Sequence, residues 1–493
     1  MVEKKMLPLV SIPDIIEHYA PKFEDLFTLG GYDNFQRYIS GLLISENKTV
    51  EGINRLFSIA TKNQSSLNRF LNKSPYSEEA LNTRRLEMLQ SNASTRFKSK
   101  GKHLGSLSID DTLLEHYGKS IDGIYMIWDH NKHCYVRAHN LLTLHYSDDK
   151  CDYPVYDKLW EYADLEALEQ KMDELDIYIN ATKRANKKEK TKGVKNWRQY
   201  LLSRYSIKQH KHPELQDVYK TKIHLAQDML SEFCKNYPSI KLPVSFDSWF
   251  TTPAFCKYIS QTLKRDYVGA IKSKETLILA GSKQKTIAEF TAELVAEHRI
   301  TKKVFQKTKI RYKGKTEYYY TYCKSHRVKN FEQKQRLLIS FNDDPINFKA
   351  DELVKKTSQA RLFISNQLKW HASGICRIYR HRWPVEVYHE EGKAEGLDKY
   401  QLRNLKAIKR HIGLVVLVYS ILQCARNDLS LLNKLQKKIS NIKDYLNGSL
   451  PYMRRLTQAQ AFHALIQWIF LQVKDEVPLA LVLKPLIKSI AYT

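Results

Sequence analysis

Strand-like and helical segments alternate along this chain, and their order indicates a mixed α/β fold with more than one domain. Three β-prone runs follow a helical N-terminal region and are expected to form an antiparallel meander. A long helical part separates them from a second β-prone block, and the chain is helical again from Lys369 onward. The meander runs are 104–114, 123–129 and 134–146, the helical part covers about 156–205 and 214–236, and the second β-prone block covers 267–366.

Three acidic residues occupy positions from which a fold could bring them together. Asp110 lies in an early strand-like run, Asp247 ends a later apolar strand, and Glu386 opens a long helix. Two divalent metal ions held by such carboxylates can activate an attacking oxygen and stabilise a leaving oxygen in phosphoryl transfer. A single carboxylate at the end of a strand or helix is more often structural, so the case depends on the pattern around Glu386.

The segment YRHRWPVEVYHEEGKAEGL (379–397) supplies that pattern. In one continuous helix, Tyr379, Arg382, Glu386 and Lys393 would fall within roughly 60° of one face. Pro384 is tolerated only in a first helical turn, so the helix is expected to restart there. Tyr379 and Arg382 would then end a preceding helix, and the shared face holds best for Glu386 and Lys393. The alternative is a surface helix with an ordinary Arg382–Glu386 ion pair.

The charge of the chain favours a polyanionic partner. It has 80 Lys and Arg residues against 53 Asp and Glu residues, a formal net charge of +27. Each phosphate that such a protein neutralises releases counterions, which indicates nucleic acid rather than a merely basic protein. Two segments concentrate this charge: 183–198, and the Lys- and Tyr-rich run 299–328, in which a turn at Gly314 predicts a twisted hairpin with a basic face.

The complete pattern Tyr-x2-Arg-x3-Glu-x6-Lys resembles the signature of the YREK group of bacterial insertion-sequence DDE transposases. LSIDDT (107–112) looks like the first-Asp strand of that family, and LPVSFDSW (242–249) looks like the second. Asp111 is an alternative to Asp110, because neighbours in a strand face opposite sides; the family's Asp-x-Thr form favours Asp110. The N-terminal segments 38–53 and 65–81 are also similar to these transposases.

The resemblance implies an α/β fold with a ribonuclease-H-like catalytic core that a β-rich insertion interrupts. It implies that Asp110, Asp247 and Glu386 are catalytic and bind two Mg²⁺ ions, which Mn²⁺ can replace, and that Tyr379, Arg382 and Lys393 contact DNA. The activity expected is metal-dependent cutting of transposon ends in double-stranded DNA, then strand transfer of the 3′-hydroxyl into a target. Some relatives stack a flipped base on a Trp of the insertion; strand 359–366 has none, which leaves Trp370 and the tyrosines at 318–320 as alternatives.

Two short helical patterns in the N-terminal region, 49–57 and 65–71, have the order of a helix-turn-helix motif. Such a motif would present Arg69 to a DNA groove, although an ordinary helical hairpin has the same pattern. The expected domains are a helical DNA-binding domain, the two parts of the core with the insertion between them, and a helical C-terminal region for a homodimer. Their ranges are 1–95, 105–265, 266–366, 367–425 and 426–493.

Other sequence features favour a cytoplasmic, nucleoid-associated bacterial protein without a membrane segment. The longest apolar stretch, 412–422, is shorter than the ~20 residues that span a bilayer. No signal peptide is expected at the N-terminus. Seven scattered cysteines without a CxxC pair fit a reducing compartment and exclude a conventional zinc finger. The rival functions are a structure-specific nuclease of the same fold, and a domesticated transposase that binds DNA without cutting it.

Overall fold

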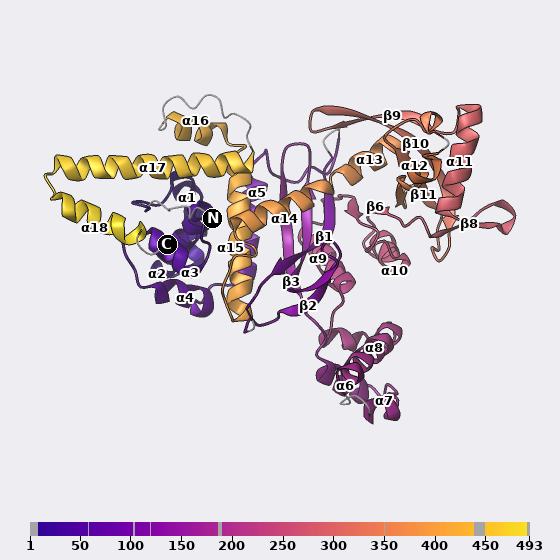
Figure 1. Ribbon diagram of the computed structural model, residues 1–493, viewed down its shortest axis with the longest axis horizontal. Helices are drawn as coiled ribbons and strands as arrows, with labels where there is room; N and C mark the ends of the chain where they lie inside the picture. Colours follow the sequence, from indigo (N-terminus) through magenta and orange to yellow (C-terminus); the bar gives the residue numbers. More distant parts are fainter. Residues whose placement is uncertain are drawn as a thin grey trace.

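A large mixed sheet occupies the middle of the protein, with helices from both ends of the chain on one side of it and a second β-rich region on the other (Figure 1). The computed structural model describes residues 8–57, 59–101, 104–118, 120–185, 190–349, 351–437 and 449–490. Residues 186–189 of the basic run and residues 438–448 of the expected C-terminal region therefore lie outside the described residues. The expected mixed α/β architecture is confirmed.

The sheet begins with an antiparallel meander of β1, β3 and β4, and β2 pairs with the outer part of β3. All three strands of the expected meander are present, but their order was wrong, because β1 pairs with β3 and not with β2. β4, which the sequence had suggested to be partly helical, is an additional strand beside β3. Most of β4 is buried, so it lacks the polar and apolar alternation of a half-exposed strand. The bounds are β1 (Ser106–Glu115), β2 (Tyr125–Asp129), β3 (Cys134–Ser147) and β4 (Asp152–Trp160).

Two short strands continue the sheet beyond β1. β5 (Val244–Phe246) runs parallel to β1, and β6 (Tyr267–Ala270) runs parallel to β5. Strands of this kind are covered on both faces, and all three residues of β5 are buried. The parallel pairing of β1 with β5 ends at Ile109 and Phe246, and the acidic residues Asp110, in the middle of β1, and Asp247, directly after β5, follow there.

A small helical unit with its own core lies in the chain between β4 and α9, the helix that packs again on β3 and β4. Trp197, Leu201 and Tyr205 of α8 pack there against Leu168 and Met172 of α6. Figure 1 shows α6, α7 and α8 extending away from the sheet. The helices of this part of the chain are α6 (Leu165–Glu174), α7 (Ala181–Ala185), α8 (Lys190–Lys208), α9 (Lys222–Asn236) and α10 (Pro253–Lys257).

The second β-rich region joins the sheet through β12, which pairs antiparallel with β6. From there the order is β12-β11-β10-β7-β8, and β9 pairs with β10 in a long hairpin whose turn contains Gly314, at φ +78°. The predicted hairpin is confirmed; helix α11 was not anticipated. The bounds are β7 (Thr276–Ile278), β8 (Gln284–Thr286), α11 (Ile287–Thr301), β9 (Gln306–Tyr312), β10 (Lys315–Val328), β11 (Gln335–Phe341), α12 (Leu353–Ser358) and β12 (Arg361–Ser365).

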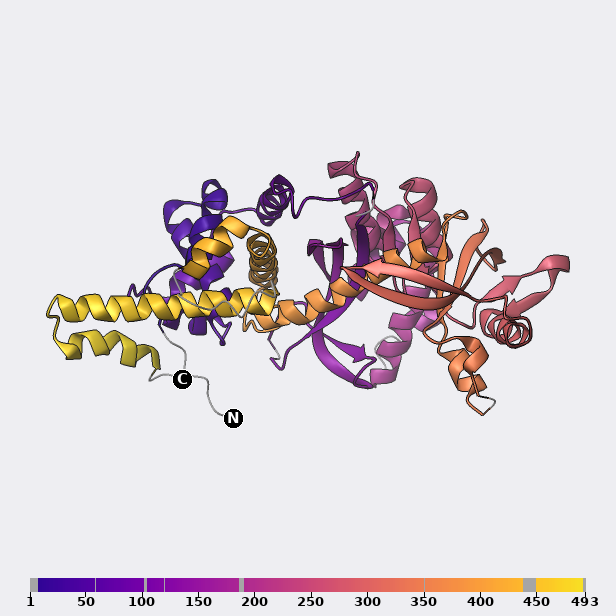
Figure 2. The ribbon, with the colours of Figure 1, turned by 90° about the horizontal axis from the view of Figure 1, so that it is seen from above.

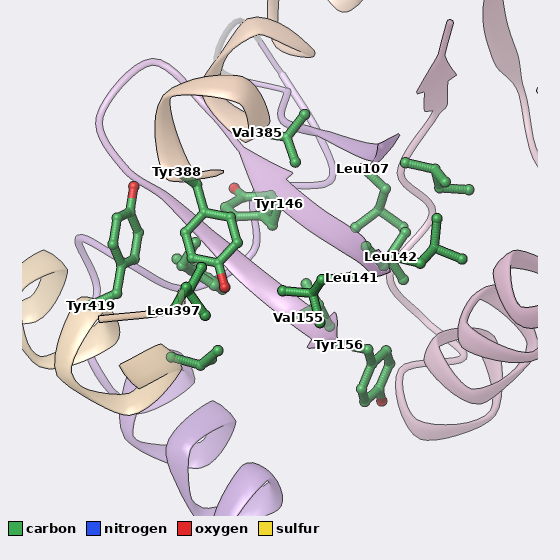
Figure 3. Packing of buried hydrophobic residues seen from close by; sticks show 14 of the residues in the cluster. Leu107, Leu141, Leu142, Tyr146, Val155, Tyr156, Val385, Tyr388, Leu397 and Tyr419 are labelled. Carbon is green, nitrogen blue, oxygen red and sulfur yellow. The ribbon is translucent and has the colours of Figure 1, made fainter. Parts of the chain in front are cut away.

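Two consecutive helices bring the chain back across the sheet, α13 (Ala372–Arg380) and α14 (Trp383–Glu395). The expected restart at Pro384 is confirmed, because this proline lies in the first turn of α14. Val385 and Tyr388 of α14 are fully buried against the sheet, beside Tyr419 of the next helix (Figure 3). This packing fixes the rotation of α14, so that Arg382 reaches both Glu386 and Asp110 in the middle of β1.

The almost completely buried helix α15 (Leu405–Ala425) joins the sheet to the N-terminal helices. Buried Arg410 donates to the carbonyls of Leu71, Ser74 and Tyr76, so its charge satisfies the C-terminal end of α4. The helices around it are α1 (Asp14–Tyr19), α2 (Leu29–Ile44), α3 (Val50–Leu56), α4 (Gln64–Lys73), α5 (Glu78–Ser91), α16 (Leu429–Lys437), α17 (Leu450–Lys474) and α18 (Leu479–Ile490). None of the described helices is both long and apolar enough to cross a membrane.

Candidate active site

Asp110 and Asp247 lie beside each other at one edge of the sheet. Ile109 of β1 is in register with Phe246 of β5, and each is followed directly by one of the two aspartates. Because the strands are parallel, both carboxylates emerge at the same level. The Asp247 carboxylate also accepts hydrogen bonds from the backbone N–H groups of Trp249 and Phe250, at 2.9 and 3.2 Å, which fix it at the start of the following turn.

Arg382 connects this edge to Glu386. Its Nη1 donates to Asp110 Oδ2 at 2.9 Å, and its Nη2 donates to Glu386 Oε1. The ion pair between Arg382 and Glu386, which belonged to the alternative of an ordinary surface helix, is present, but it is part of a larger cluster that includes Asp110. Arg382 is only 13% exposed, and its position at the junction of α13 and α14 brings it to Asp110 in the middle of β1.

Asp111 faces a different set of partners, as strand alternation requires. Its Oδ2 accepts hydrogen bonds from Lys222 Nζ at 2.8 Å and from Asn140 Nδ2 at 2.7 Å. Neither contact could be anticipated from sequence, since both partners are distant along the chain. Asp111 is therefore already compensated by a neighbouring cation, whereas Asp110 shares its cation with Glu386.

The electrostatics of the cluster follow from burial. Removal from water raises the pKa of Asp110 to about 7, although Arg382 lowers it, and the charges of Asp111 and Asp247 raise it further. Burial also raises the pKa of Asp247, against the hydrogen bonds from the backbone of Phe250 and Trp249. Burial opposes the charge of Arg382, but Tyr379, Asp110 and Glu386 together raise its pKa above the ordinary value. The site thus concentrates negative charge that a cation stabilises.

The other residues expected to contact DNA lie on three different helices, α13, α14 and α4. Tyr379 is on α13 rather than α14, so the single helical face does not extend to it; its ring is 5.3 Å from the Arg382 guanidinium carbon. Lys393 is in the last turn of α14. Arg69 is exposed on α4, which lies on the other side of α15 from the sheet, so it is not part of this cluster (Figure 1). The two helices expected for a helix-turn-helix motif are present as α3 and α4.

A cavity of about 290 Å³ lies beside Arg382, between α13 and the inner face of the β9–β10 hairpin. Among the alternatives for base stacking, Tyr319 lines this cavity, and Trp370 does not belong to its lining. Trp383, which is 55% exposed, was not singled out from sequence, since its place beside the cavity depends on the break between the two helices. The main lining side chains are Glu317, Tyr319, Arg361, Phe363, Tyr379, Arg380, Arg382 and Trp383.

The donor chemistry of the cluster fits a divalent metal ion. Asp110, Asp247 and Glu386 offer carboxylate oxygens, the ligands that Mg²⁺ prefers. Arg382 already places a positive charge between Asp110 and Glu386, which shows that this point accommodates a cation. As the side chains stand, the described residues contain no group of three or more His, Cys, Asp or Glu side chains arranged to hold a metal ion.

Two family models match the chain, and together they include all three acidic residues. The model of the archaeal putative transposase ISC1217 matches residues 199–434, and the model of the DDE superfamily endonuclease matches residues 32–288. No curated protein matches the chain. Asp110 and Asp247 lie within the second match, and Glu386 lies within the first. The chain belongs to the DDE superfamily of endonucleases.

Proposed function

We propose that this protein is a DNA transposase of the YREK group, which cuts the ends of a bacterial insertion sequence and joins them to target DNA. The observation that carries the proposal is the junction of Asp110 and Glu386 through Arg382, with Asp247 on the neighbouring strand. A mixed sheet with one acid on each of two adjacent strands, directly after their parallel pairing ends, and a third acid on a helix packed against it, supports a ribonuclease-H-like core. The β7–β12 region supports the assignment of an insertion.

Asp110, Asp247 and Glu386 would hold the two Mg²⁺ ions, for which Mn²⁺ can substitute. These ions would supply activation of the attacking oxygen and stabilisation of the leaving oxygen. The protein side chains position the DNA: Arg382 and Lys393 bind phosphates as cations, and Tyr379 donates a hydrogen bond. Burial of the acidic edge strengthens each of these interactions, because fewer water molecules screen them.

The cavity beside Arg382 is the place we assign to a base extruded from the DNA end. Aromatic rings of Tyr319, Phe363 and Trp383 line it, and an exposed ring can stack on a base. The test is the fluorescence of 2-aminopurine at successive positions of an end duplex, compared between the wild type and Trp383→Ala. A fluorescence increase upon binding that Trp383→Ala reduces supports this role, and equal signals at every position count against it.

Assembly of two ends requires two protomers, and we assign the contact to α17 and α18. The first half of α17 is anchored by buried residues such as Met453 and Leu456, whereas the far half of α17 and α18 is exposed (Figure 1). A surface on which many apolar side chains are exposed next to one another is typical of a protein interface. Its exposed members are Phe462, Ile466, Phe470, Leu471, Val473, Leu479, Leu481, Leu483 and Ile487. Gel filtration of Phe470→Ser/Leu481→Ser, with and without DNA, tests this: an unchanged mass would refute it.

The decisive experiment is cleavage of labelled duplexes that carry the element's own ends, in Mg²⁺ or Mn²⁺. Glu386→Gln should bind the duplex and fail to cut it, because it loses a charged oxygen ligand. Glu390→Gln is the matched control, since Glu390 is exposed one turn further along the same helix. Binding without cleavage by the wild type would instead indicate the domesticated, non-cutting protein, and cleavage without strand transfer would indicate the nuclease.

A further inference from the structure

The two faces of the β9–β10 hairpin differ in chemistry. Along β9, alternation places Lys307, Lys309 and Arg311 on one face, and all three are exposed. The strand register puts Tyr320 opposite Lys307 and Tyr318 opposite Lys309, on the same face. This outer face of the hairpin is therefore a row of cations on one strand beside two tyrosines on the other, of which Tyr318 is exposed and Tyr320 is partly buried.

The inner face is occupied by the protein itself. Ile310 is buried, and Tyr319 lines the cavity beside Arg382. Glu317 Oε1 accepts a hydrogen bond from Arg380 Nη2 of α13 at 2.7 Å. The end of the hairpin is held as well, because Lys313 Nζ lies 3.4 Å from the buried Asp152. The hairpin is thus fixed above α13, and only its outer face is available to a partner (Figures 1 and 2).

The cations of the outer face differ from those beneath it in how their charge is balanced. Arg377, Arg380 and Arg382 each bind a carboxylate, at 2.7 to 2.9 Å in their respective pairs with Asp149, Glu317 and Asp110. Within the part of the chain that the structure describes, Lys307, Lys309 and Arg311 form no ion pair.

Lys307 instead lies over the ring of Tyr318, 4.9 Å from its centroid. Tyr318 is itself 50% exposed. The outer face therefore carries uncompensated positive charge and the exposed phenol of Tyr318, which can donate a hydrogen bond to a phosphate oxygen.

The dimensions of this face fit duplex DNA. Cations two residues apart on a strand are separated by about 7 Å, so the row extends for about 14 Å. A two-stranded ribbon also fits the major groove, which is about 12 Å wide. The cations are spread along the strand and do not converge on one point, as they would around a single bound anion. This arrangement suits the row of phosphates in a DNA backbone.

We propose that the outer face of the β9–β10 hairpin binds the phosphate backbone of duplex DNA, through Lys307, Lys309 and Arg311 with Tyr318 beside them. The surface is separate from the acidic cluster, but the inner face of the same hairpin borders it, so the bound duplex would lie next to the DNA being cut. The proposal rests on the proposed function for the source of that DNA, which is the transposon end, its flanking DNA or the target.

The test is the salt dependence of DNA binding by the full-length protein. Lys307→Gln/Lys309→Gln/Arg311→Gln removes the three cations, and Lys324→Gln/Arg327→Gln/Lys329→Gln removes the same charge from exposed residues at the far end of β10 and the turn after it. Anisotropy titrations over a range of KCl would use three duplexes: a cleaved end, an end with flanking DNA, and an unrelated target duplex. A matching melting temperature confirms that the triple variant folds.

Log K falls as log salt rises, and each phosphate contact contributes about 0.9 to the steepness of that fall. The outer-face variant, which loses three cations, should therefore show a slope that is less steep by about 2 to 3 units. The loss should be present for the duplex that the hairpin contacts, which identifies its source, and the control variant should keep the wild-type slope. Unchanged slopes on all three duplexes, or an equal decrease in the control, would overturn the proposal. A wild type that binds with the expected slopes but never cuts would refute the transposase function alone.

Discussion

Arg382 Nη1 lies 2.9 Å from Asp110 Oδ2, although the two residues are 272 positions apart in the chain. The same guanidinium binds Glu386, so one side chain holds two of the three proposed metal ligands. A buried cation between carboxylates offsets their mutual repulsion and the cost of removing them from water. It would also compete with any other cation for the same oxygens, so the proposed DNA contact of Arg382 would be coupled to metal binding.

Replacement of Arg382 by Gln should strengthen metal binding in the absence of DNA. The variant leaves Asp110 and Glu386 without their internal cation, and we expect about tenfold tighter binding of Mn²⁺, or about 1.4 kcal/mol. Electron paramagnetic resonance of free Mn²⁺ during titration measures this directly. Arg380→Gln is the matched control, because Arg380 binds Glu317 instead, and its affinity should not change. Equal or weaker Mn²⁺ binding by Arg382→Gln would show that the guanidinium does not compete.

The two adjacent aspartates should respond differently to amidation. Asp110→Asn should reduce end cleavage by at least about 100-fold, since even residues that only support metal ligands often cost 10- to 100-fold. Asp111→Asn should retain more activity, because Asp111 is bound by Lys222 and Asn140 away from Arg382. Cleavage rates with equal DNA binding give the comparison. Greater loss in Asp111→Asn would move the first metal ligand to that position.

Local patterns were sufficient to locate the acidic positions. Asp247 follows a short apolar strand, and Pro384 marks the start of α14, as the sequence indicated. The β9–β10 hairpin was also predictable, because Gly314 adopts the positive φ that its turn requires. These features depend on a few neighbouring residues, and the same chemistry determines them in a peptide and in the folded protein.

Long-range contacts could not be inferred in this way. β4 was mistaken for part of a helix because both of its faces are mostly covered, which removes the alternation that identifies a strand. The pairing of Asp111 with Lys222 spans 111 positions and depends on how α9 packs on β3. The cavity beside Trp383 arises from the angle between two helices and a hairpin. Packing decides each of these features, and a single sequence does not reveal it.

Loss of Arg454 should destabilise the fold through a buried carboxylate. Arg454 of α17 donates to Glu395, the last residue of α14, whose side chain is 1% exposed. Arg454→Met leaves that charge with Lys48 as its remaining cation, and we expect a loss of about 3 kcal/mol in the free energy of unfolding. Urea denaturation measures it. Arg454→Met/Glu395→Gln should recover much of the loss; a double variant no more stable than the single one would contradict this account.

Lys48 should make stability depend on pH in the alkaline range. Burial lowers its pKa from 10.5 to about 8, although Glu395 nearby opposes that decrease. Above pH 8 the folded protein has released the Lys48 proton while the unfolded chain still holds it, so the free energy of unfolding should rise from pH 8 towards 10.5. The rise is on the order of 3 kcal/mol. Lys48→Met lacks this titration, so its stability relative to the wild type should fall over the same interval, in urea denaturation at pH 7.5, 8.5 and 9.5. Parallel pH profiles for the two proteins would show that Lys48 stays protonated in both states over this interval, and that burial does not lower its pKa.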